Sequence, residues 1–454
     1  MLKRIAVFII IAGLTVIPAT SQAQEADLAI TGGLLIDGFG GRPLENAVVL
    51  VRDDTIVAVG REGELTVPPG AKVIDANGMT VMPGIWESHG HLRIFGAGAP
   101  PTLFFSKFPD RVMEVMTTVA EINLLAGVTT FRDLGGPLEE QGELREAIEA
   151  GEKKGPRLFL AGPTVKQATG KEGEGRFVVG SRADAERIVD ELVRMKADQI
   201  WSDGAWDLEL LQALTETAHS AGLGIDLGVR QVKAWETGIH AGVDRLHAVF
   251  TADALSDYSD SELRLLVRGE KPVALGPSAN ILRGPYVAPS LEMREAYARA
   301  LRFPESLDHP RFRSQFAPDI YAYLRETWQS PQSIPWGIGA ATRMEVVRQK
   351  VRRFIQAGGV EQIVAGTDAG SPLNYHASVP REIAHLVDAG LSPMQAIQSA
   401  TLRPAQMQGV DDRLGTIAVG KLADIIVVDG NPLDDISLLQ YRVSRVIKGG
   451  VVYR

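Results

Sequence analysis

Two histidines separated by a single residue are the side chains of this chain best suited to bind a metal. His89 and His91 stand at the end of an apolar run in the stretch VMPGIWESHGHLR, residues 81–93. In a β-strand, the side chains of residues i and i+2 leave on the same face, so these two imidazoles converge. Such a pair binds borderline metals such as zinc, nickel or cobalt. The pair alone is a weak signal, because it needs a fold around it and a further ligand.

The long middle of the chain supplies a fold for such a site. From Pro83 to about Pro404, amphipathic helices alternate with short apolar strands. The period predicts helices at 112–126, 144–154, 183–196, 208–221, 231–241, 259–268 and 344–357. Strands are expected after them in GVTTFRD, GPRLFLAG, ADQIWSDG, GLGIDLGV, GVDRLHAVF, KPVALGPS and GVEQIVAGTDAG. With the opening strand these make eight, which predicts an α/β fold of the (β/α)8 TIM barrel type over residues 83–405. A doubly wound sheet is disfavoured, because no G-x-G-x-x-G follows a strand.

Both ends of the chain are β-rich. Residues 24–82 contain the runs DLAITGGLLIDG, AVVLVRDDTIVAVG and AKVIDANGMTVMPG, and residues 406–454 contain LADIIVVDG and VSRVIKGGVVYR. Val, Ile and Thr dominate each run, and Gly, Asp or Asn interrupts it. We therefore expect a small β-sandwich domain built from both chain ends.

A carboxylate at the end of the eighth strand can complete the metal site. The strand closes on Gly366-Thr367-Asp368-Ala369-Gly370, and the C-terminal ends of barrel strands line the active site. Two imidazoles and Asp368 leave a fourth position open for water, whose pKa a metal lowers toward neutrality. Asp368 can take the proton from that water and pass it to a leaving nitrogen. One divalent metal ion is expected, with zinc first and iron, nickel or manganese as alternatives.

The N-terminus predicts export from the cytoplasm. Met1-Leu2-Lys3-Arg4 is basic, Ile5–Pro18 is mostly apolar, and small residues precede a cleavage site after Ala23. This pattern is typical of a signal peptide over residues 1–23, and the apolar run is short for a membrane anchor. The 454-residue chain has no cysteine and therefore no disulfide. We expect a periplasmic or secreted protein that leaves the membrane once the signal is cut.

Charge and composition narrow the partners. The net charge is −9 and no Lys/Arg-rich run occurs, which argues against nucleic acid as a partner. A small-molecule substrate is expected, and a homo-oligomer is left open. The long segment Ser278–Arg343, at the catalytic face of the expected barrel, is expected to form a lid or a substrate wall.

The motifs resemble those of the amidohydrolase superfamily, in its imidazolonepropionase-like and prolidase-like branch. MPGIWESHGH is similar to the first-strand metal motif, LLAGVTTFRDLGG to the second strand and VAGTDAG to the eighth. The tail matches at greater length, through REIAHLVDAGLSPMQAIQSATLRPAQMQG and RLGTIAVGKLADIIVVDGNP. The resemblance implies metal-dependent hydrolysis of a C–N bond in a cyclic amide, an amidine or a dipeptide.

Several metal-ligand positions of that family are substituted here. Trp201 stands where the fourth-strand lysine is usual, Gly228 at the fifth-strand histidine and Ala248 at the sixth-strand histidine. His247 comes one residue early, so strand alternation would point it out of the barrel unless a bulge corrects it. The second metal's ligands are therefore missing, and His247 is kept as a tentative ligand.

Other polar residues have two readings each. Lys166 in the third-strand loop and His376 after the eighth strand are tentative substrate contacts, and a solvated or structural role is at least as well supported. Asp226 could face the lumen one layer below Gly228. Arg132 and Asp133 could orient the histidines or form a structural pair. Glu87 could lie below the metal or be a satisfied interior carboxylate.

Three functions of different classes remain open. The first, which we favour, is a hydrolase with one metal held by His89, His91 and Asp368. The second is a degenerate barrel that binds a small ligand without turnover, for which Trp201, Gly228 and Ala248 speak. The third is a structural subunit, for which nothing specific in the sequence speaks.

Overall fold

The computed structural model describes residues 25–168, 177–229, 234–251, 258–269, 284–302, 310–329 and 344–454. Several predictions fall outside these ranges. They are the signal peptide over residues 1–23 with its cleavage after Ala23, the strand KPVALGPS, most of the loop KQATGKEGEG and about half of Ser278–Arg343.

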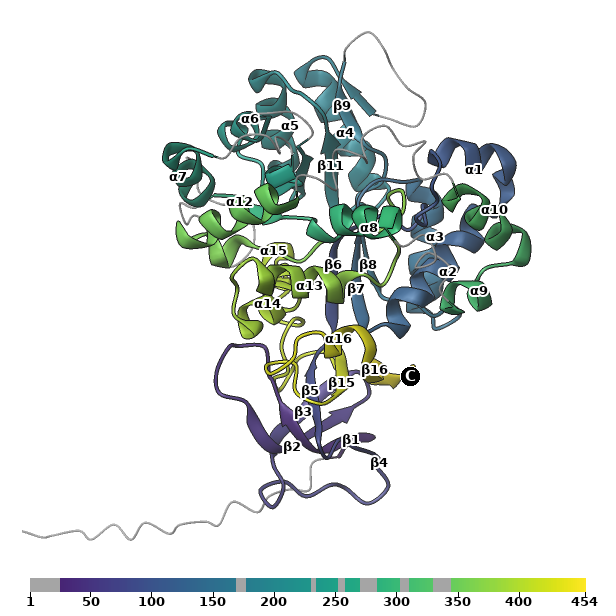
Figure 1. Ribbon diagram of the computed structural model, residues 1–454, viewed down its shortest axis with the longest axis vertical. Coiled ribbons are helices and arrows are strands. Elements are labelled where there is room, and N and C mark those ends of the chain that lie inside the picture. The colour runs from purple at the N-terminus through teal and green to yellow at the C-terminus, as the bar shows by residue number, and fades with distance from the viewer. Residues whose placement is uncertain are drawn as a thin grey trace, which may run out of the picture.

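Strands from both ends of the chain form one eight-stranded sheet, seen as purple and yellow arrows at the foot of Figure 1. The strands are β1 (Leu28–Leu35), β2 (Leu44–Arg52), β3 (Thr55–Arg61), β4 (Lys72–Asp75), β5 (Met79–Pro83), β15 (Ile425–Asp429), β16 (Val443–Lys448) and β17 (Val451–Val452). Their order is β17-β16-β15-β5-β1-β2-β3, with β4 beside β1. Apolar side chains of both ends, among them Ile30, Val49, Ile425 and Ile447, share one buried cluster. The expected joining of the two ends is therefore seen, while a second sheet that would make a sandwich stays a prediction, as do the domain boundaries.

The strands described in the middle of the chain pair in parallel. A three-stranded sheet has the order β6-β7-β8, and a six-stranded sheet has the order β10-β9-β11-β12-β13-β14. These strands are β6 (Ile85–Gly90), β7 (Val128–Asp133), β8 (Arg157–Leu160), β9 (Val165–Gln167), β10 (Phe177–Val179), β11 (Gln199–Asp203), β12 (Gly224–Gly228), β13 (Arg245–His247) and β14 (Tyr286–Ala288). Every residue of β6, β7, β11, β12 and β13 is buried, as expected of parallel strands covered on both faces.

Backbone contacts connect the two parallel sheets on both sides. The amide of Asp198, just before β11, donates to the carbonyl of Leu160 in β8 at 2.8 Å. On the other side, the segment 363–369 bridges β14 through Val287–Ile363 and β6 through Gly90–Ala369. The α/β prediction is confirmed. These contacts support the closed eight-stranded barrel, which stays a prediction.

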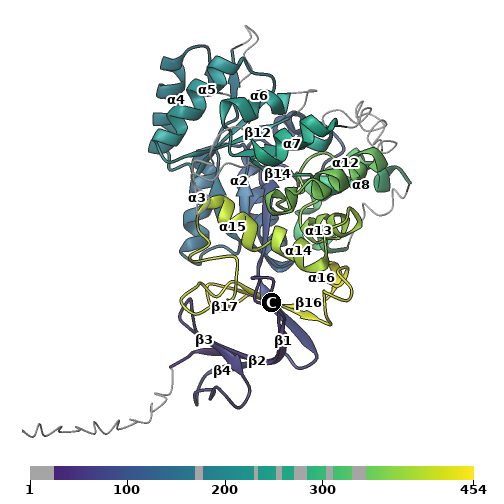
Figure 2. The same ribbon diagram turned by 90° about the vertical axis from the view of Figure 1, so that its left-hand side faces the viewer.

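Helices surround the parallel strands, and α4 to α7 cluster at the end far from the eight-stranded sheet (Figure 2). The helices are α1 (Pro101–Lys107), α2 (Val112–Leu125), α3 (Leu138–Glu149), α4 (Arg182–Arg194), α5 (Leu208–Ser220), α6 (Ala234–Ala241), α7 (Asp260–Arg268), α8 (Leu291–Arg302), α9 (Pro310–Gln315), α10 (Pro318–Trp328), α12 (Met344–Gln356), α13 (Val379–Asp388), α14 (Pro393–Ser399), α15 (Leu402–Gln408) and α16 (Leu438–Tyr441).

Helix α4 illustrates why these segments are helical. Ser181 caps its first turn, because the hydroxyl accepts the amide of Asp184. Ala185, Ile188 and Leu192 are spaced to lie on one face, and all three are buried. The expected helices agree with the structure to within a few residues, except that α3 begins six residues before the expected Leu144 and ends at Glu149 rather than Lys154.

The strand β14 was not expected from the sequence. It pairs with β13 in parallel register, with His247 opposite Ala288, and its three residues are too few to show a period. The expected strand KPVALGPS lies outside the described residues and stays a prediction.

In the part of the chain that the structure describes, no helix combines the length and apolarity needed to cross a bilayer.

Candidate metal centre

The two histidines of the HxH pair converge as predicted. His89 lies on β6 and His91 directly follows it, and their ring centroids are 5.3 Å apart. Gly90 between them has no room for a side chain, because a Cβ there would overlap the ring of Phe131. A glycine is therefore required for β6 to lie this close to β7.

Asp368 is brought to the histidines by backbone hydrogen bonds. Its amide donates to the carbonyl of His89 at 2.7 Å, and the amide of His91 donates to the carbonyl of Ala369 at 2.9 Å. The φ of Asp368 is +59°, a left-handed conformation that non-glycine residues rarely adopt outside turns and functional sites.

The three predicted ligands form one cluster. Asp368 Oδ1 lies 3.0 Å from His91 Nε2 and 3.7 Å from His89 Nε2. One ligand atom from each residue falls within 4.8 Å of the other two, and no other group of this kind occurs among the described residues. Two imidazoles and a carboxylate at this spacing match the donor set of a zinc-type site with an open position.

His89 fits a metal ligand better than a structural residue. Its side chain is 4% exposed, and neither ring nitrogen makes a hydrogen bond to a described group. A buried imidazole in that state is costly unless it has a partner. Burial also lowers the pKa of His89 well below its ordinary value, which keeps the ring in the neutral form that binds metals.

The electrostatics favour an ionised Asp368. Burial acts to raise its pKa, but the two imidazoles beside it, His89 and His91, outweigh burial and lower the pKa to about 2. Burial alone would lower the pKa of His91. The hydrogen bond to Asp368 has the larger effect, so the pKa lies above its ordinary value. The hydrogen bond between His91 and Asp368 thus favours the charged form of each group.

His247 points toward the cluster, although strand alternation predicted the reverse. Its ring centroid lies 4.5 Å from that of His89, and the ring is buried. Ala248, the next residue, has φ of +58°, so the strand's alternation ends there. His247 is not one of the three clustered ligands, and its Nε2 contacts Asp226 Oδ1 at 2.7 Å. Burial lowers the pKa of His247, and the bond to Asp226 offsets this only in part.

Trp201 fills the space next to the histidines. Its ring centroid lies 5.3 Å from those of both His89 and His247. A Cβ on Gly228 would stand 2.7 Å from Trp201 Cη2, so the indole takes the space that a side chain at position 228 would need. The residues at these two positions therefore do not fit a second metal ion.

Lys166 and His376 lie in different surroundings. Lys166 is on β9, with its Nζ 3.6 Å from Asp203 Oδ2 and its side chain 29% exposed. His376 is buried. Its Nε2 lies 2.7 Å from the Ile94 carbonyl oxygen, and its Nδ1 lies 3.1 Å from the side-chain nitrogen Nδ2 of Asn123. Both ring nitrogens of His376 are thus engaged within the protein. This geometry supports the structural role that the sequence left open for His376, and a substrate contact there stays a prediction.

Glu87, Arg132 and Asp133 prove to be interior residues with partners. Glu87 accepts the amides of His89 and Thr367 and the Thr367 hydroxyl, and burial raises its pKa to about 8. Arg132 binds Asp226 at 2.7 Å. Asp133 accepts the amide of Leu92 and the side chain of Gln141, which fixes the chain just after His91.

Two residues at the site were missed by sequence reasoning. The Ser371 hydroxyl donates to Asp368 Oδ1 at 2.7 Å, and Arg245 Nη1 binds Asp226 Oδ2 at 3.1 Å. Arg245 precedes His247 by two residues in β13, so shared strand parity was a usable signal. The sequence contained no comparable signal for Ser371 beyond its place in a polar loop.

Known hydrolases are similar to this chain in sequence and in fold. The amidohydrolase family matches residues 301–452. The chain is 24% identical to ochratoxinase from Aspergillus niger over 97% of this chain and 88% of that protein. It is 25% identical to imidazolonepropionase from Symbiobacterium thermophilum over 89% and 91% of the two chains. The fold is similar to the crystal structure of a Xaa-Pro dipeptidase with bound methionine, with a TM-score of 0.71, 24% identity and coverage of 94% and 99%. The resemblance to the amidohydrolase superfamily seen in the sequence is confirmed, and the similar proteins are hydrolases that act on carbon–nitrogen bonds.

Proposed function

We propose that this protein is a hydrolase with a single divalent metal ion, which cleaves the amide-type C–N bond of a small molecule. The observation that carries the proposal is the cluster of His89, His91 and Asp368, in which a buried histidine has no hydrogen bond to a described group at either nitrogen. Zinc is the first expectation, and iron, nickel and manganese suit the same donors. The proposed frame is a closed (β/α)8 barrel, supported by the contacts of segment 363–369 with β6 and β14.

Each residue has a defined task in this proposal. His89 Nε2, His91 Nε2 and Asp368 hold the metal, and His247 is proposed as the fourth ligand. When bound, such a metal polarises the scissile carbonyl and lowers the pKa of water toward neutrality. Asp368 takes a proton from the attacking water and passes it to the leaving nitrogen. The ionised state of Asp368 suits it to accept that proton, and its hydrogen bond from Ser371 holds the carboxylate in place.

Lys166 is proposed as a substrate contact through its positive charge. Its partly exposed side chain beside Asp203 suits an anionic group of the substrate better than an apolar one. The export signal at residues 1–23 supports a periplasmic or secreted location, and the chain's acidity supports a small-molecule partner over nucleic acid.

Metal content and hydrolysis, measured together, test the proposal. Purified protein is expected to hold about one tightly bound divalent metal per chain by elemental analysis. Asp368→Ala is expected to lose both the metal and the hydrolysis of amide substrates. A correctly folded protein that stays metal-free in excess zinc, iron, nickel or manganese would contradict the proposal.

The second candidate, binding without turnover, is favoured by one observation. Trp201 packs against both His89 and His247 and narrows the space beside the proposed metal. Under this reading, Trp201→Ala does not create hydrolysis, and the wild-type protein binds amides without consuming them. Turnover by the wild type with one metal bound would exclude it.

A further inference from the structure

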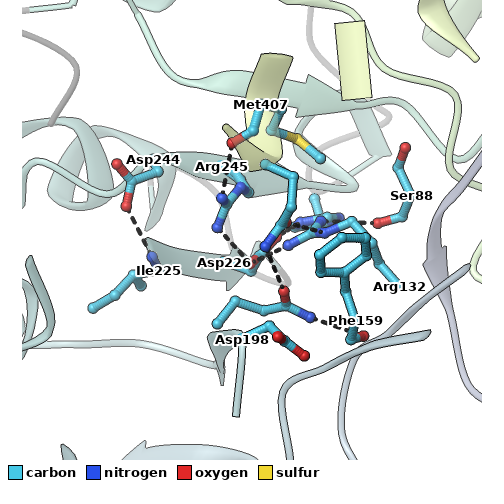
Figure 3. A network of polar contacts seen from close by, with 12 residues as sticks. Ser88, Arg132, Phe159, Asp198, Ile225, Asp226, Asp244, Arg245 and Met407 are labelled. Carbon is cyan, nitrogen blue, oxygen red and sulfur yellow. Dashed lines mark hydrogen bonds and ion pairs between the residues drawn. The ribbon is translucent and has the colours of Figure 1, made fainter. Parts of the chain in front are cut away.

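Asp226 on β12 is a buried carboxylate surrounded by three basic side chains, Arg132 from β7 and Arg245 and His247 from the adjacent β13. Its Oδ2 accepts Arg132 Nη2 at 2.7 Å and Arg245 Nη1 at 3.1 Å, as Figure 3 shows. Its Oδ1 contacts His247 Nε2 at 2.7 Å. The side chains of Asp226 and Arg132 have no exposed area, and that of Arg245 is 3% exposed. Two guanidinium groups on one oxygen keep Asp226 ionised, because a protonated carboxyl would leave both charges uncompensated.

The bond between Asp226 and His247 decides where the imidazole proton lies. An ionised carboxylate can only accept hydrogen bonds, so the hydrogen between the two must belong to Nε2 of His247. The other nitrogen, Nδ1, is buried and makes no hydrogen bond to a described group. The His247 ring lies beside His89 and Trp201. In the neutral imidazole of His247, the lone pair therefore lies on Nδ1. The ring that carries this lone pair is in contact with the proposed metal centre.

We infer that Asp226 is a positioning residue, which fixes His247 with its proton on Nε2 so that Nδ1 can serve as the fourth ligand of the metal. This inference rests on the proposed function. Histidine ligands commonly donate their other N–H to a carboxylate, which orients the ring and makes the ligating nitrogen more basic. Arg132 and Arg245 act one step further back, by holding Asp226 ionised and in register. Arg132 also donates to the carbonyl of Ser88 at 3.1 Å, next to His89.

The protonation pattern can be read directly in the wild-type protein. We would label histidine with ¹⁵N and record long-range ¹H–¹⁵N spectra, assigning His247 by the signal lost in His247→Gln. The expected spectrum has a protonated Nε2 and an unprotonated Nδ1 in the metal-free protein, with the Nδ1 shift moving when one equivalent of Zn²⁺ is added. A protonated Nδ1, or an Nδ1 shift that does not respond to bound Zn²⁺, would overturn the inference.

A charge-matched variant tests Asp226 without leaving two arginines unpaired. Asp226→Leu combined with Arg245→Met keeps the net charge of the cluster, since one anion and one cation are removed together. We expect Zn²⁺ affinity, measured by chelator competition, to fall about 10–100-fold, and to fall by less in Arg245→Met alone, which keeps the Asp226–His247 bond and the Arg132 partner of Asp226. Unchanged affinity in a folded double variant would overturn the inference. Failure of the wild type to bind any metal would instead contradict the proposed function.

Discussion

Trp201 and Gly228 interlock across neighbouring strands, because the indole occupies the place of the side chain that position 228 lacks. The two residues lie on β11 and β12, which pair in parallel, and a Cβ at 228 would stand 2.7 Å from Cη2 of Trp201. The two departures from the family pattern are thus one coupled change.

The interlock predicts that Gly228→Ala destabilises the protein through Trp201. Gly228 does not have a positive φ, so alanine suits its backbone and only the clash remains. We expect the free energy of unfolding to fall by about 1–3 kcal/mol. Trp201→Phe in the same chain should recover part of this, seen as a coupling energy in a urea-denaturation double-mutant cycle. Additive effects would contradict the interlock.

Gly90→Ala is expected to disturb the metal ligands on both sides of it. The new methyl would overlap the Phe131 ring, so β6 must move away from β7. We expect unfolding free energy to fall by about 1–3 kcal/mol and Zn²⁺ affinity to fall with it. Gly142→Ala in α3, where a Cβ meets nothing within 4 Å, is the matched control and should be neutral or stabilising by up to about 1 kcal/mol.

Asp368→Asn removes the charge of the carboxylate while keeping a residue that tolerates the backbone conformation at position 368. Asparagine tolerates the left-handed conformation at φ of +59° better than most residues, so the fold should persist. Without a carboxylate to move the proton, kcat should fall about 10²–10⁴-fold. Circular dichroism checks the fold and a chromogenic amide assay checks the rate. Retention of the wild-type rate would remove Asp368 from the mechanism.

His376→Leu should affect stability rather than substrate binding. The change removes His376 as the buried hydrogen-bond partner of the Ile94 carbonyl and of the Asn123 side-chain amide. We expect the free energy of unfolding to fall by about 1–3 kcal/mol. Metal content and KM should stay close to wild type. A large rise in KM with unchanged stability would restore His376 as a substrate contact.

The raised pKa of Glu382 predicts that the free energy of unfolding falls as the pH rises. Burial raises its pKa from 4.5 to about 7, so between those values the folded state binds the proton more tightly than the unfolded state. The stabilisation is full below pH 4.5 and is lost on approaching pH 7, by up to about 3 kcal/mol. His385 acts in the same direction, since the hydrogen bond to Glu292 outweighs burial and raises its pKa. Urea denaturation of Glu382→Gln at pH 5 and pH 8 should show a smaller difference than the wild type. If the variant and the wild type show the same difference in stability between pH 5 and pH 8, Glu382 is not the source of the pH dependence.

The ligands were predictable because they stand in regular local patterns. His89 and His91 follow strand alternation, and Asp368 stands at the end of a strand within a family-like motif. The direction of His247 was predicted wrongly, because the resemblance placed Ala248 on the inward face, whereas β13 pairs with both neighbours without a register shift and His247 shares the face of Arg245, which also contacts Asp226. The partners of Asp226 escaped prediction for a different reason. They come from two strands, β7 and β13, and meet a carboxylate on a third, β12, so their meeting depends on the arrangement of the strands and not on spacing within one segment.

The backbone bond from Asp368 to the carbonyl of His89 makes assembly of the metal site a late event in folding. His91 and Asp368 are 277 residues apart in the chain, and contacts of such separation form slowly because a long loop must close first. A nascent chain that has only residues 89 and 91 in place offers two ligands of the cluster, and capture of the metal needs segment 363–369 to reach β6. The rate at which metal becomes resistant to a chelator therefore measures completion of the fold, and with it the moment at which the molecule becomes an enzyme.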